Sequence, residues 1–294
     1  MTAGPDLDLV SPPTPADGLL PDQWYIARRS SDLGTVPQTV LLGGTEIGLW
    51  RDERGDVHAQ PARTCEERDG YLWVWTGAEA PSSGPLAIAD PFQGRGVWVR
   101  LTQRVKAGFL DSVENTVDLI HPLFAHPWTH PLWWAHRLGI QASMRVVITP
   151  DALGWTAEGF MWGRRIMWQE VRLPDRVRLL LLPDTALATD AFVHHVPETP
   201  AMTRFEILLG RRCAPWERPG ATDGPQAWLL HRQDRVILEA LQRCRTRHGP
   251  VAECHARADA YTLLFRRIFR LAQEGRWQRE WSRHSTQREV VVRV

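Results

Sequence analysis

The stretch RVVITPDALGWTAEGFMWGRRIMWQEVRL, residues 145–173, predicts the fold of the larger part of the chain. It contains three strand-like runs, and the turns between them carry Pro, Asp and Gly. Further runs of the same kind, VRLLLL, AFVHHV and TRFEILLG, follow as far as Leu209. We therefore expect an antiparallel sheet in this region.

After this region the pattern becomes helical. DRVILEALQRCRTRHG, residues 234–249, places five apolar residues on one helical face, namely Val236, Ile237, Ala240, Leu241 and Cys244. ADAYTLLFRRIFRLAQEG, residues 258–275, places six on another, namely Tyr261, Leu264, Phe265, Ile268, Phe269 and Ala272. Strands followed by helices, without βαβ alternation, predict an α+β fold in which helices cover an antiparallel β-sheet.

The region before residue 80 also predicts strands. QTVLLGGTEIGLWRDERGDVHA, residues 38–59, breaks at Gly43-Gly44 and at Gly55, which indicates two hairpin turns in an antiparallel β-meander. YLWVWTG, residues 71–77, is a further short strand.

Composition and charge exclude several classes of partner. The formal net charge of the 294 residues is +1, so no overall field recruits nucleic acid or an anionic membrane. The sequence contains no GxGxxG motif and no P-loop, which leaves a nucleotide site without support. The four cysteines, Cys65, Cys213, Cys244 and Cys254, form no CxxC, CxH or CxxH pair.

The expected location is the cytoplasm. The N-terminal sequence MTAGPDLDLVSPPTPADG has no basic region followed by an apolar run, so we do not expect a signal peptide. No stretch approaches the roughly 18 to 20 apolar residues that a membrane helix needs.

A candidate metal site lies in DLIHPLFAHP, residues 118–127. Pro122 disfavours continued helix, so we expect Asp118–His121 to close a short helix. His121 at the helix end and His126 on the following loop are then able to converge on one cation. Two histidines and one carboxylate, with open coordination positions, form the facial triad of non-haem Fe(II) oxygenases.

The surrounding residues resemble a known iron signature. SVENTVDLIHPLFAHP, residues 112–127, is similar to the mononuclear-iron motif of the Rieske non-haem iron oxygenases, with matches at Glu114, Asn115, Asp118, His121 and His126. QDRVILEA, residues 233–240, resembles the helix start from which that family draws its carboxylate ligand. The resemblance implies a mononuclear Fe(II) held by His121, His126 and Asp234. The alternative for Asp234 is an aspartate that the helix dipole favours at a helix N-terminus.

The resemblance extends from Asp22 to about Gly275 and implies a domain organisation. We expect a disordered tail at 1–20, a remnant of a Rieske-type β subdomain at 21–80, a helix-grip, START-like catalytic domain at 81–280 and a C-terminal tail at 281–294. The family holds a [2Fe–2S] cluster on Cys-x-His and Cys-x-x-His motifs between its VHA and YLWVW segments. Here only His58 and Cys65 lie nearby, so we expect no cluster in this chain and an external electron supply.

Asp118 and Asn115 are the candidate catalytic residues besides the iron ligands. In the family the aspartate matching Asp118 bridges from a neighbouring subunit's cluster to an iron-bound histidine. A carboxylate bonded to a ligating histidine also fixes its tautomer and orientation, so a second role for Asp118 remains open.

Three functions are therefore consistent with the sequence. The first is the catalytic subunit of a cluster-less Rieske-type oxygenase, similar to subunits of bacterial methylxanthine N-demethylases. It would hydroxylate or demethylate a small, aromatic or heteroaromatic substrate with O2 and with electrons from a ferredoxin or a cluster-bearing subunit. The second is a non-catalytic partner in a hetero-oligomer, and the third a metal-free carrier of hydrophobic ligands. A homo- or hetero-oligomer is expected. The candidate residues lining the cavity between sheet and helices are Trp155, Phe160, Met161, Trp162 and Met167, although at strand spacing about half of them should be core.

Overall fold

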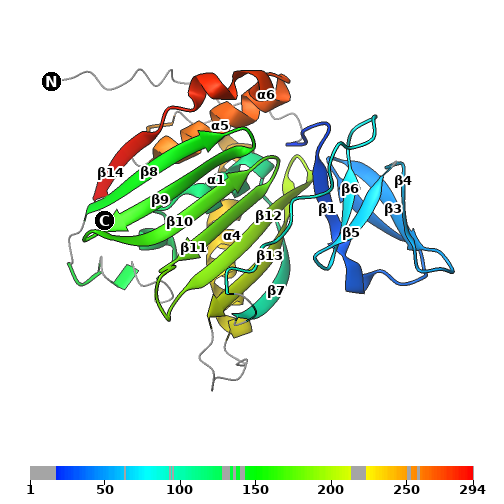
Figure 1. Ribbon diagram of the computed structural model, residues 1–294, viewed down its shortest axis with the longest axis horizontal. Coiled ribbons are helices and arrows are strands. Elements are labelled where there is room, and N and C mark those ends of the chain that lie inside the picture. Colours follow the sequence, from blue (N-terminus) through cyan, green and yellow to red (C-terminus); the bar gives the residue numbers. More distant parts are fainter. Residues whose placement is uncertain are drawn as a thin grey trace.

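The computed structural model describes residues 18–62, 64–92, 94, 96–127, 133–134, 137–139, 143–212, 223–249, 253–256 and 259–293. These residues form an N-terminal lobe of two small sheets and a larger part in which helices cover one face of an eight-stranded sheet (Figure 1). The expected α+β fold, with an antiparallel sheet covered by helices, is confirmed.

The N-terminal lobe contains two three-stranded antiparallel sheets. Their strand orders are β1-β6-β5 and β2-β3-β4. The strands are β1 (Trp24–Arg29), β2 (Gln38–Leu42), β3 (Thr45–Arg51), β4 (Val57–Gln60), β5 (Cys65–Arg68) and β6 (Tyr71–Trp75). Gly43, Gly44 and Gly55 have φ values of 56°, 78° and 87° at the two turns, a region that favours glycine, so the expected hairpins are confirmed.

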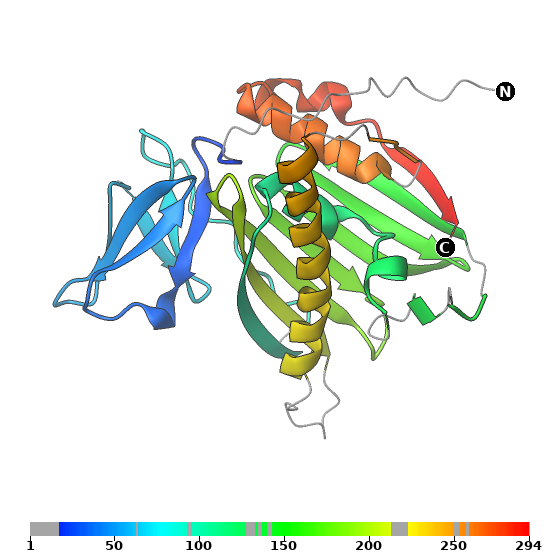
Figure 2. The ribbon, with the colours of Figure 1, turned by 180° about the vertical axis from the view of Figure 1, so that it is seen from behind.

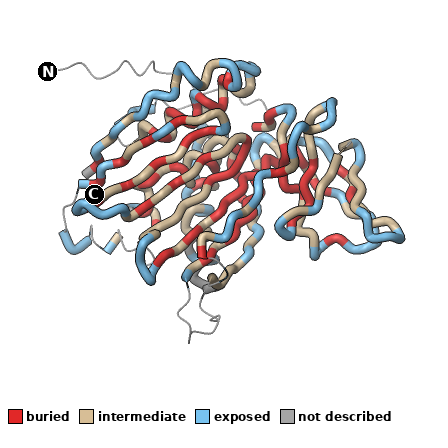
Figure 3. The backbone as a smooth tube through the Cα atoms, in the orientation of Figure 1, coloured by how far each residue is buried: buried red, intermediate tan, exposed pale blue. Residues whose placement is uncertain are grey.

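The large sheet has the order β14-β8-β9-β10-β11-β12-β13-β7, and its neighbouring strands are antiparallel. Its strands are β7 (Gly96–Val105), β8 (Ser143–Asp151), β9 (Gly154–Met161), β10 (Arg164–Arg172), β11 (Arg176–Leu181), β12 (Thr189–Thr199), β13 (Met202–Arg212) and β14 (Arg288–Arg293). Along β8 and β9 every second residue is buried, as a sheet covered on one face requires (Figure 3).

The long helices lie on one face of this sheet (Figure 2). They are α1 (Phe109–Val117), α4 (Asp223–His248) and α5 (Ala260–Gln273), with the short helices α2 (Pro122–Ala125) and α6 (Trp277–Glu280) and the 3-10 turns η1 (Ser30–Asp32) and η3 (Trp281–His284). The apolar face predicted for α5 is confirmed, because Phe265, Ile268 and Phe269 are 1%, 2% and 1% exposed.

Helix α4 differs from the prediction. It begins at Asp223, eleven residues before Asp234, so Asp234 lies inside the helix and not at its start. The face predicted to be buried is exposed, with Val236 60% and Ile237 44% accessible, whereas Leu238 is 2% exposed and packs against the sheet. The buried face predicted from apolar spacing was therefore wrong, because the side of α4 that contacts the sheet is largely polar.

Both expected tails differ in part from the structure. Residues 288–293 of the expected C-terminal tail form β14, which pairs with β8. Most of the expected N-terminal tail lies outside the described residues, but Leu20 is 1% exposed and packs with Phe109 and Val113. Both segments are held by apolar burial against the large domain. Within the described ranges no helix combines the length and apolar character that crossing a bilayer needs.

Candidate metal centre

Helix α1 fixes where the histidine segment begins. Phe109, Val113 and Val117 bury one face of the helix in the core. Gln169 of β10 donates from Nε2 to the carbonyl of Val117 (3.2 Å) and so satisfies an acceptor that a helix C-terminus leaves open. The chain leaves α1 at Asp118, whose Oδ1 accepts the backbone N–H of Ile120 at 2.8 Å. The carboxylate thus forms a local turn that directs His121.

The helix boundary around His121 differs from the prediction. α1 ends at Val117, and His121 precedes the single turn of α2, where Pro122 is the first helical residue. Proline is favoured at that position because its missing N–H would have no intrahelical partner there. Pro122 therefore starts a helix, and α2 carries the chain from His121 to His126.

The two imidazoles face each other, with their Nε2 atoms 3.1 Å apart. Each ring donates its Nδ1–H to an oxygen: His121 to the backbone carbonyl of Asp118 (2.5 Å) and His126 to Oε1 of Gln233 (3.2 Å). Gln233 is itself held by a 3.1 Å bond from Nε2 to the carbonyl of Pro127. These bonds place both protons on Nδ1 and leave both Nε2 lone pairs directed at the space between the rings.

Asp234 of α4 completes the group. Its Oδ1 lies 3.6 Å from Nε2 of His121 and 3.5 Å from Nε2 of His126. A point equidistant from the three atoms lies about 2.0 Å from each, the usual distance from imidazole nitrogen or carboxylate oxygen to a divalent cation. Oδ1 is also buried without a hydrogen-bond partner, which is costly for a carboxylate unless a cation is present. The donor set therefore fits a divalent metal.

No second group of this kind is found among the residues that the structure describes. His58 bonds through Nε2 to Asp52 (3.1 Å) and stacks on Trp50, and Cys65 donates its thiol to the carbonyl of Val57 (3.0 Å). Burial raises the pKa of the Cys65 thiol, which disfavours the thiolate that metals bind. Both residues are engaged in contacts within the N-terminal lobe.

Burial favours the neutral form of two histidines at the site. It lowers the pKa of His126, an effect that Asp234 opposes, and it lowers the pKa of His231 to about 4. Neutral imidazole is the form that binds metal, so burial favours ligation at neutral pH. Burial also raises the pKa of Asp118, which makes its carboxyl easier to protonate than an exposed one.

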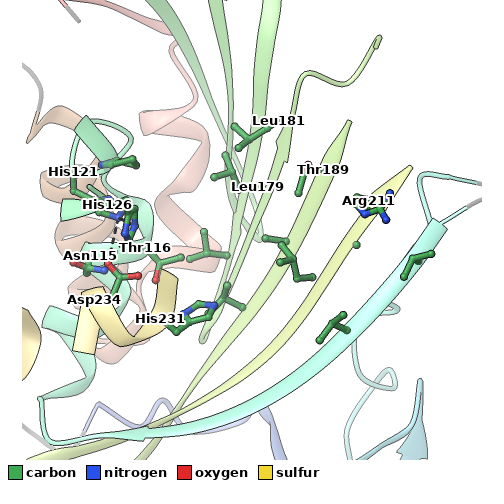
Figure 4. Close-up of a pocket in the computed structure, with 18 residues that line it drawn as sticks. Asn115, Thr116, His121, His126, Leu179, Leu181, Thr189, Arg211, His231 and Asp234 are labelled. Carbon is green, nitrogen blue, oxygen red and sulfur yellow. Dashed lines mark hydrogen bonds and ion pairs between the residues drawn. The ribbon is translucent and has the colours of Figure 1, made fainter. Parts of the chain in front are cut away.

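A cavity of about 220 Å³ opens beside the three donor residues (Figure 4). Asn115, Thr116 and His231 line it on the helix side. The sheet side is contributed by β7, β11, β12 and β13, through Val97, Val99, Val177, Leu179, Leu181, Thr189, Ala191, Val193, Leu209, Gly210 and Arg211. An apolar pocket with few polar groups is typical of a small-molecule site.

The residues expected to line the cavity lie elsewhere. Trp155, Met161 and Met167 are buried in the core of the β8–β10 end of the sheet, Phe160 stacks with Arg145, and Trp162 is 74% exposed. Three of the five are therefore core residues, because strand spacing gives the face of a side chain but not which helix lies above it.

Of the predicted site residues, Asn115 lines the cavity beside Asp234 (Figure 4), whereas Asp118 contributes its backbone carbonyl to His121. The Asp118 carboxylate itself bonds to the backbone N–H of Ile120. His130 and His136, which follow the motif in the sequence, lie outside the described residues.

Sequence reasoning missed a buried contact between Thr116 and β12. Nε2 of His195 lies 2.8 Å from Oγ1 of Thr116, and Nδ1 of His195 donates to the carbonyl of Asp175 at 3.0 Å. Burial lowers the pKa of His195 to about 3, so the ring is neutral and its Nε2 accepts the Thr116 hydroxyl proton. Thr116 also lines the cavity. Thr116 lies next to Asn115 within the motif, but its partner is 79 residues away.

Comparisons with known proteins agree with the fold. No family model matches the chain. Chloroplastic chlorophyllide a oxygenase of Chlamydomonas reinhardtii is 32% identical over 73 residues, which are 25% of this chain and only 11% of that protein.

The solved structures cover far more of the chain. Dicamba monooxygenase bound to dicamba superposes with a TM-score of 0.65 and 16% identity, over 86% of this chain and 97% of that one. The oxygenase in its reduced complex with ferredoxin in carbazole 1,9a-dioxygenase gives 0.63 and 15%, over 92% and 93%. At these identities the likeness shows the fold. This chain has the fold of Rieske-type oxygenase subunits, as its resemblance to the Rieske non-haem iron oxygenases implies.

Proposed function

We propose that the chain is the catalytic subunit of a mononuclear non-haem iron oxygenase, with Fe(II) bound by His121, His126 and Asp234. One observation carries this proposal: three donor atoms from two distant segments lie 3.1–3.6 Å apart, and one of them is a buried carboxylate oxygen without a hydrogen-bond partner. Two imidazoles and one carboxylate with open positions is the ligand set of non-haem Fe(II) oxygenases.

Bound Fe(II) would supply the reaction of dioxygen with the substrate. The residues of this chain orient and enclose that reaction. The Asp118 carbonyl and Gln233 hold the two imidazoles through their Nδ1–H groups. The apolar strand residues exclude water from the substrate. Asn115 and Thr116 give the helix side of the cavity its polar groups. A small aromatic or heteroaromatic substrate fits such walls, with hydroxylation or oxidative demethylation as the reaction.

Electrons would come from outside the chain. β4 and β5 are joined by residues 61–64 alone, in the place where the family carries cluster ligands, and His58 and Cys65 have other partners. We propose that residues 21–80 are a remnant of the cluster-carrying domain and that a ferredoxin or a cluster-bearing subunit delivers the electrons. The solved complex of the carbazole oxygenase with ferredoxin is a precedent for an external donor.

We propose a supporting role for Asp118. Its carboxylate bonds to the Ile120 N–H and not to the imidazole, so we expect iron ligation to survive the loss of its charge. We expect Asp118→Asn, which keeps the acceptor for Ile120, to retain one Fe(II) per chain. Loss of iron in that variant would instead make Asp118 part of the metal site.

The test of the proposed function is anaerobic Fe(II) titration of the metal-free chain. We expect one Fe(II) per chain, and more than about 100-fold weaker binding in His126→Ala and Asp234→Ala, because losing a ligand exceeds the 10- to 100-fold cost of losing a supporting contact. His248→Ala, an exposed histidine on the same helix as Asp234, is the matched control and keeps full affinity. Absence of stoichiometric iron, or equal iron binding in all four proteins, would leave a non-catalytic partner or a metal-free carrier.

A further inference from the structure

His231 of α4 lines the cavity next to the three donor residues (Figure 4). It precedes Asp234 by three residues, and side chains at that spacing lie on the same face of a helix. The charges of Asp234 and His126 both act on its imidazole, so the ring lies beside the metal site. His231 is not itself a donor, because the described donor atoms within 4.8 Å of one another belong to His121, His126 and Asp234.

The ring nitrogens of His231 have no partner among the residues that the structure describes. No hydrogen bond joins either nitrogen to another described residue. The other histidines around the cavity differ, because His195 is bonded at both ring nitrogens and His121 and His126 are bonded at Nδ1. A polar group without a hydrogen bond is costly in apolar surroundings, so the unpartnered imidazole indicates that a ligand supplies the partner.

Asn115 is a second group of this kind. It lines the cavity from α1, and its side-chain amide likewise forms no hydrogen bond with a described residue. The neighbouring Thr116 differs, because its hydroxyl bonds to His195 at 2.8 Å. A primary amide has donors and an acceptor, and a neutral imidazole has one of each. The helix side of the cavity therefore offers two uncharged groups that are each able to donate and to accept.

The opposite wall has a different character. Leu179, Ala191 and Leu209 are cross-strand neighbours on β11, β12 and β13, and they line the cavity with apolar side chains. A flat apolar ring is able to lie against this wall, whereas only an edge with both a donor and an acceptor satisfies the helix side. A lactam, which is an amide within a ring, places an N–H next to a carbonyl on one edge and carries no charge.

We propose that the substrate is a flat, uncharged heteroaromatic molecule with a lactam edge, and that His231 and Asn115 bind this edge. The apolar face of the ring then lies on the wall formed by Leu179, Ala191 and Leu209. His231 is a specificity residue in this arrangement, because it selects the molecule by its edge and fixes which part of the ring approaches the metal site. The identification of this ligand as the substrate rests on the proposed function, whereas binding of a lactam edge by His231 does not.

The test compares 2-quinolone, which has a lactam edge, with naphthalene, which has two fused rings of the same size without polar atoms. Equilibrium dialysis of the full chain, free of metal, gives both dissociation constants. In His231→Phe, which replaces the imidazole by an apolar ring, we expect 2-quinolone to bind about 10-fold more weakly and naphthalene to bind at least as tightly. Asn115→Leu should act in the same direction.

Two further variants serve as controls. His231→Gln keeps a donor and an acceptor, so it should retain most of the affinity for 2-quinolone. His248→Phe makes the same substitution at an exposed position of α4 and should change neither dissociation constant.

The ratio of the two affinities decides the inference. A preference for 2-quinolone that is reduced in His231→Phe, with naphthalene still bound, supports recognition of the lactam edge even if the chain binds no iron. If His231→Phe no longer binds naphthalene, the ratio in Asn115→Leu decides in its place. An unchanged ratio, or binding of neither probe by the unaltered chain, overturns the inference. Because these measurements contain no metal, failure of the iron titration leaves them unaffected, and the two proposals fail separately.

Discussion

The two halves of the large sheet share the alternation of inward and outward side chains. One half has a filled interior, whereas the other encloses a cavity. Under α5, the inner faces of β8, β9 and β10 are filled by large side chains such as Trp155, Met161 and Met167. Under α1 and α4, the inner faces of β11, β12, β13 and β7 carry mainly smaller ones, and the cavity remains. Alternation marks the inner face of both halves equally. Side-chain size and the covering helix decide which half is core and which is a site.

Gln169 lies at the border between the two halves. It is fully buried on β10 and donates to the carbonyls of Val117 and Thr116 at the end of α1, at 3.2 and 3.4 Å. The filled half thereby holds the helix from which the histidine segment starts. Rigid packing on one side is thus able to position a site on the other.

The largest expected difference between the halves is in stability. Phe265→Ala removes a ring that is 1% exposed and packs against Phe269, so we expect the free energy of unfolding to fall by about 3–5 kcal/mol. Leu179→Ala, in the wall of the existing cavity, should cost less than about 2 kcal/mol because fewer contacts are lost. Urea denaturation measures both values. Equal losses would show that the second half is packed as tightly as the first.

The next effect concerns the support of the metal site. Gln233→Leu removes the acceptor of the His126 Nδ1–H, and we expect Fe(II) binding to weaken about 10- to 100-fold without a change of fold. Gln242→Leu, further along the same helix and bonded to Thr246, is the matched control. Anaerobic titration of Fe(II) with both variants gives the comparison. If the two variants bind iron equally, Gln233 does not orient His126.

A smaller effect is a pH dependence of stability, which comes from the buried His195 that contacts Thr116. The pKa of His195 is about 3 in the folded chain, because burial disfavours its charged form, and about 6.5 in the unfolded chain. Between these values only the unfolded state binds the proton, so stability falls as the pH falls below 6.5, by about 2 kcal/mol at about pH 5.

His195→Gln should remove this contribution. We expect the slope of the unfolding free energy against pH to decrease by about 1.4 kcal/mol per unit between about pH 4.5 and 6. Denaturation of metal-free protein across that range measures the slope. An unchanged slope would mean that the imidazole is protonated in the folded chain as easily as in the unfolded one.

The smallest expected effect on stability is in the cavity itself. Ala191→Val adds two methyl groups to β12 in the wall of the cavity, where there is space, so the free energy of unfolding should change by less than about 1 kcal/mol. Binding of a small aromatic ligand in the cavity should weaken by about 10-fold or more, because the added methyl groups occupy the ligand's volume. Calorimetry and urea denaturation together test this. A strongly destabilised variant would show that no such space exists.

Much of the fold could be predicted from residue patterns. The turns at Gly43-Gly44 and Gly55, the strand runs from β8 to β13 and the buried face of α5 all follow local periodicity, and the structure contains them. The buried face of α4 could not be predicted this way, because the helix presents Leu238 among polar residues to the sheet and leaves Val236 and Ile237 exposed. Apolar spacing predicts the buried face of a helix only when the apolar side is the side that contacts the rest of the protein.

The candidate metal site also combines features that the sequence predicted with features that only the tertiary structure shows. The sequence alone pointed to His121, His126 and Asp234 as candidate donors: the two histidines by their spacing, and Asp234 through the resemblance to the Rieske non-haem iron oxygenases. Only the tertiary structure decided that Nε2 and Oδ1 atoms separated by more than a hundred residues lie within 3.6 Å. The same is true of the cavity and of the contact between Thr116 and His195, because helix packing on the sheet brings together residues that are far apart in the chain.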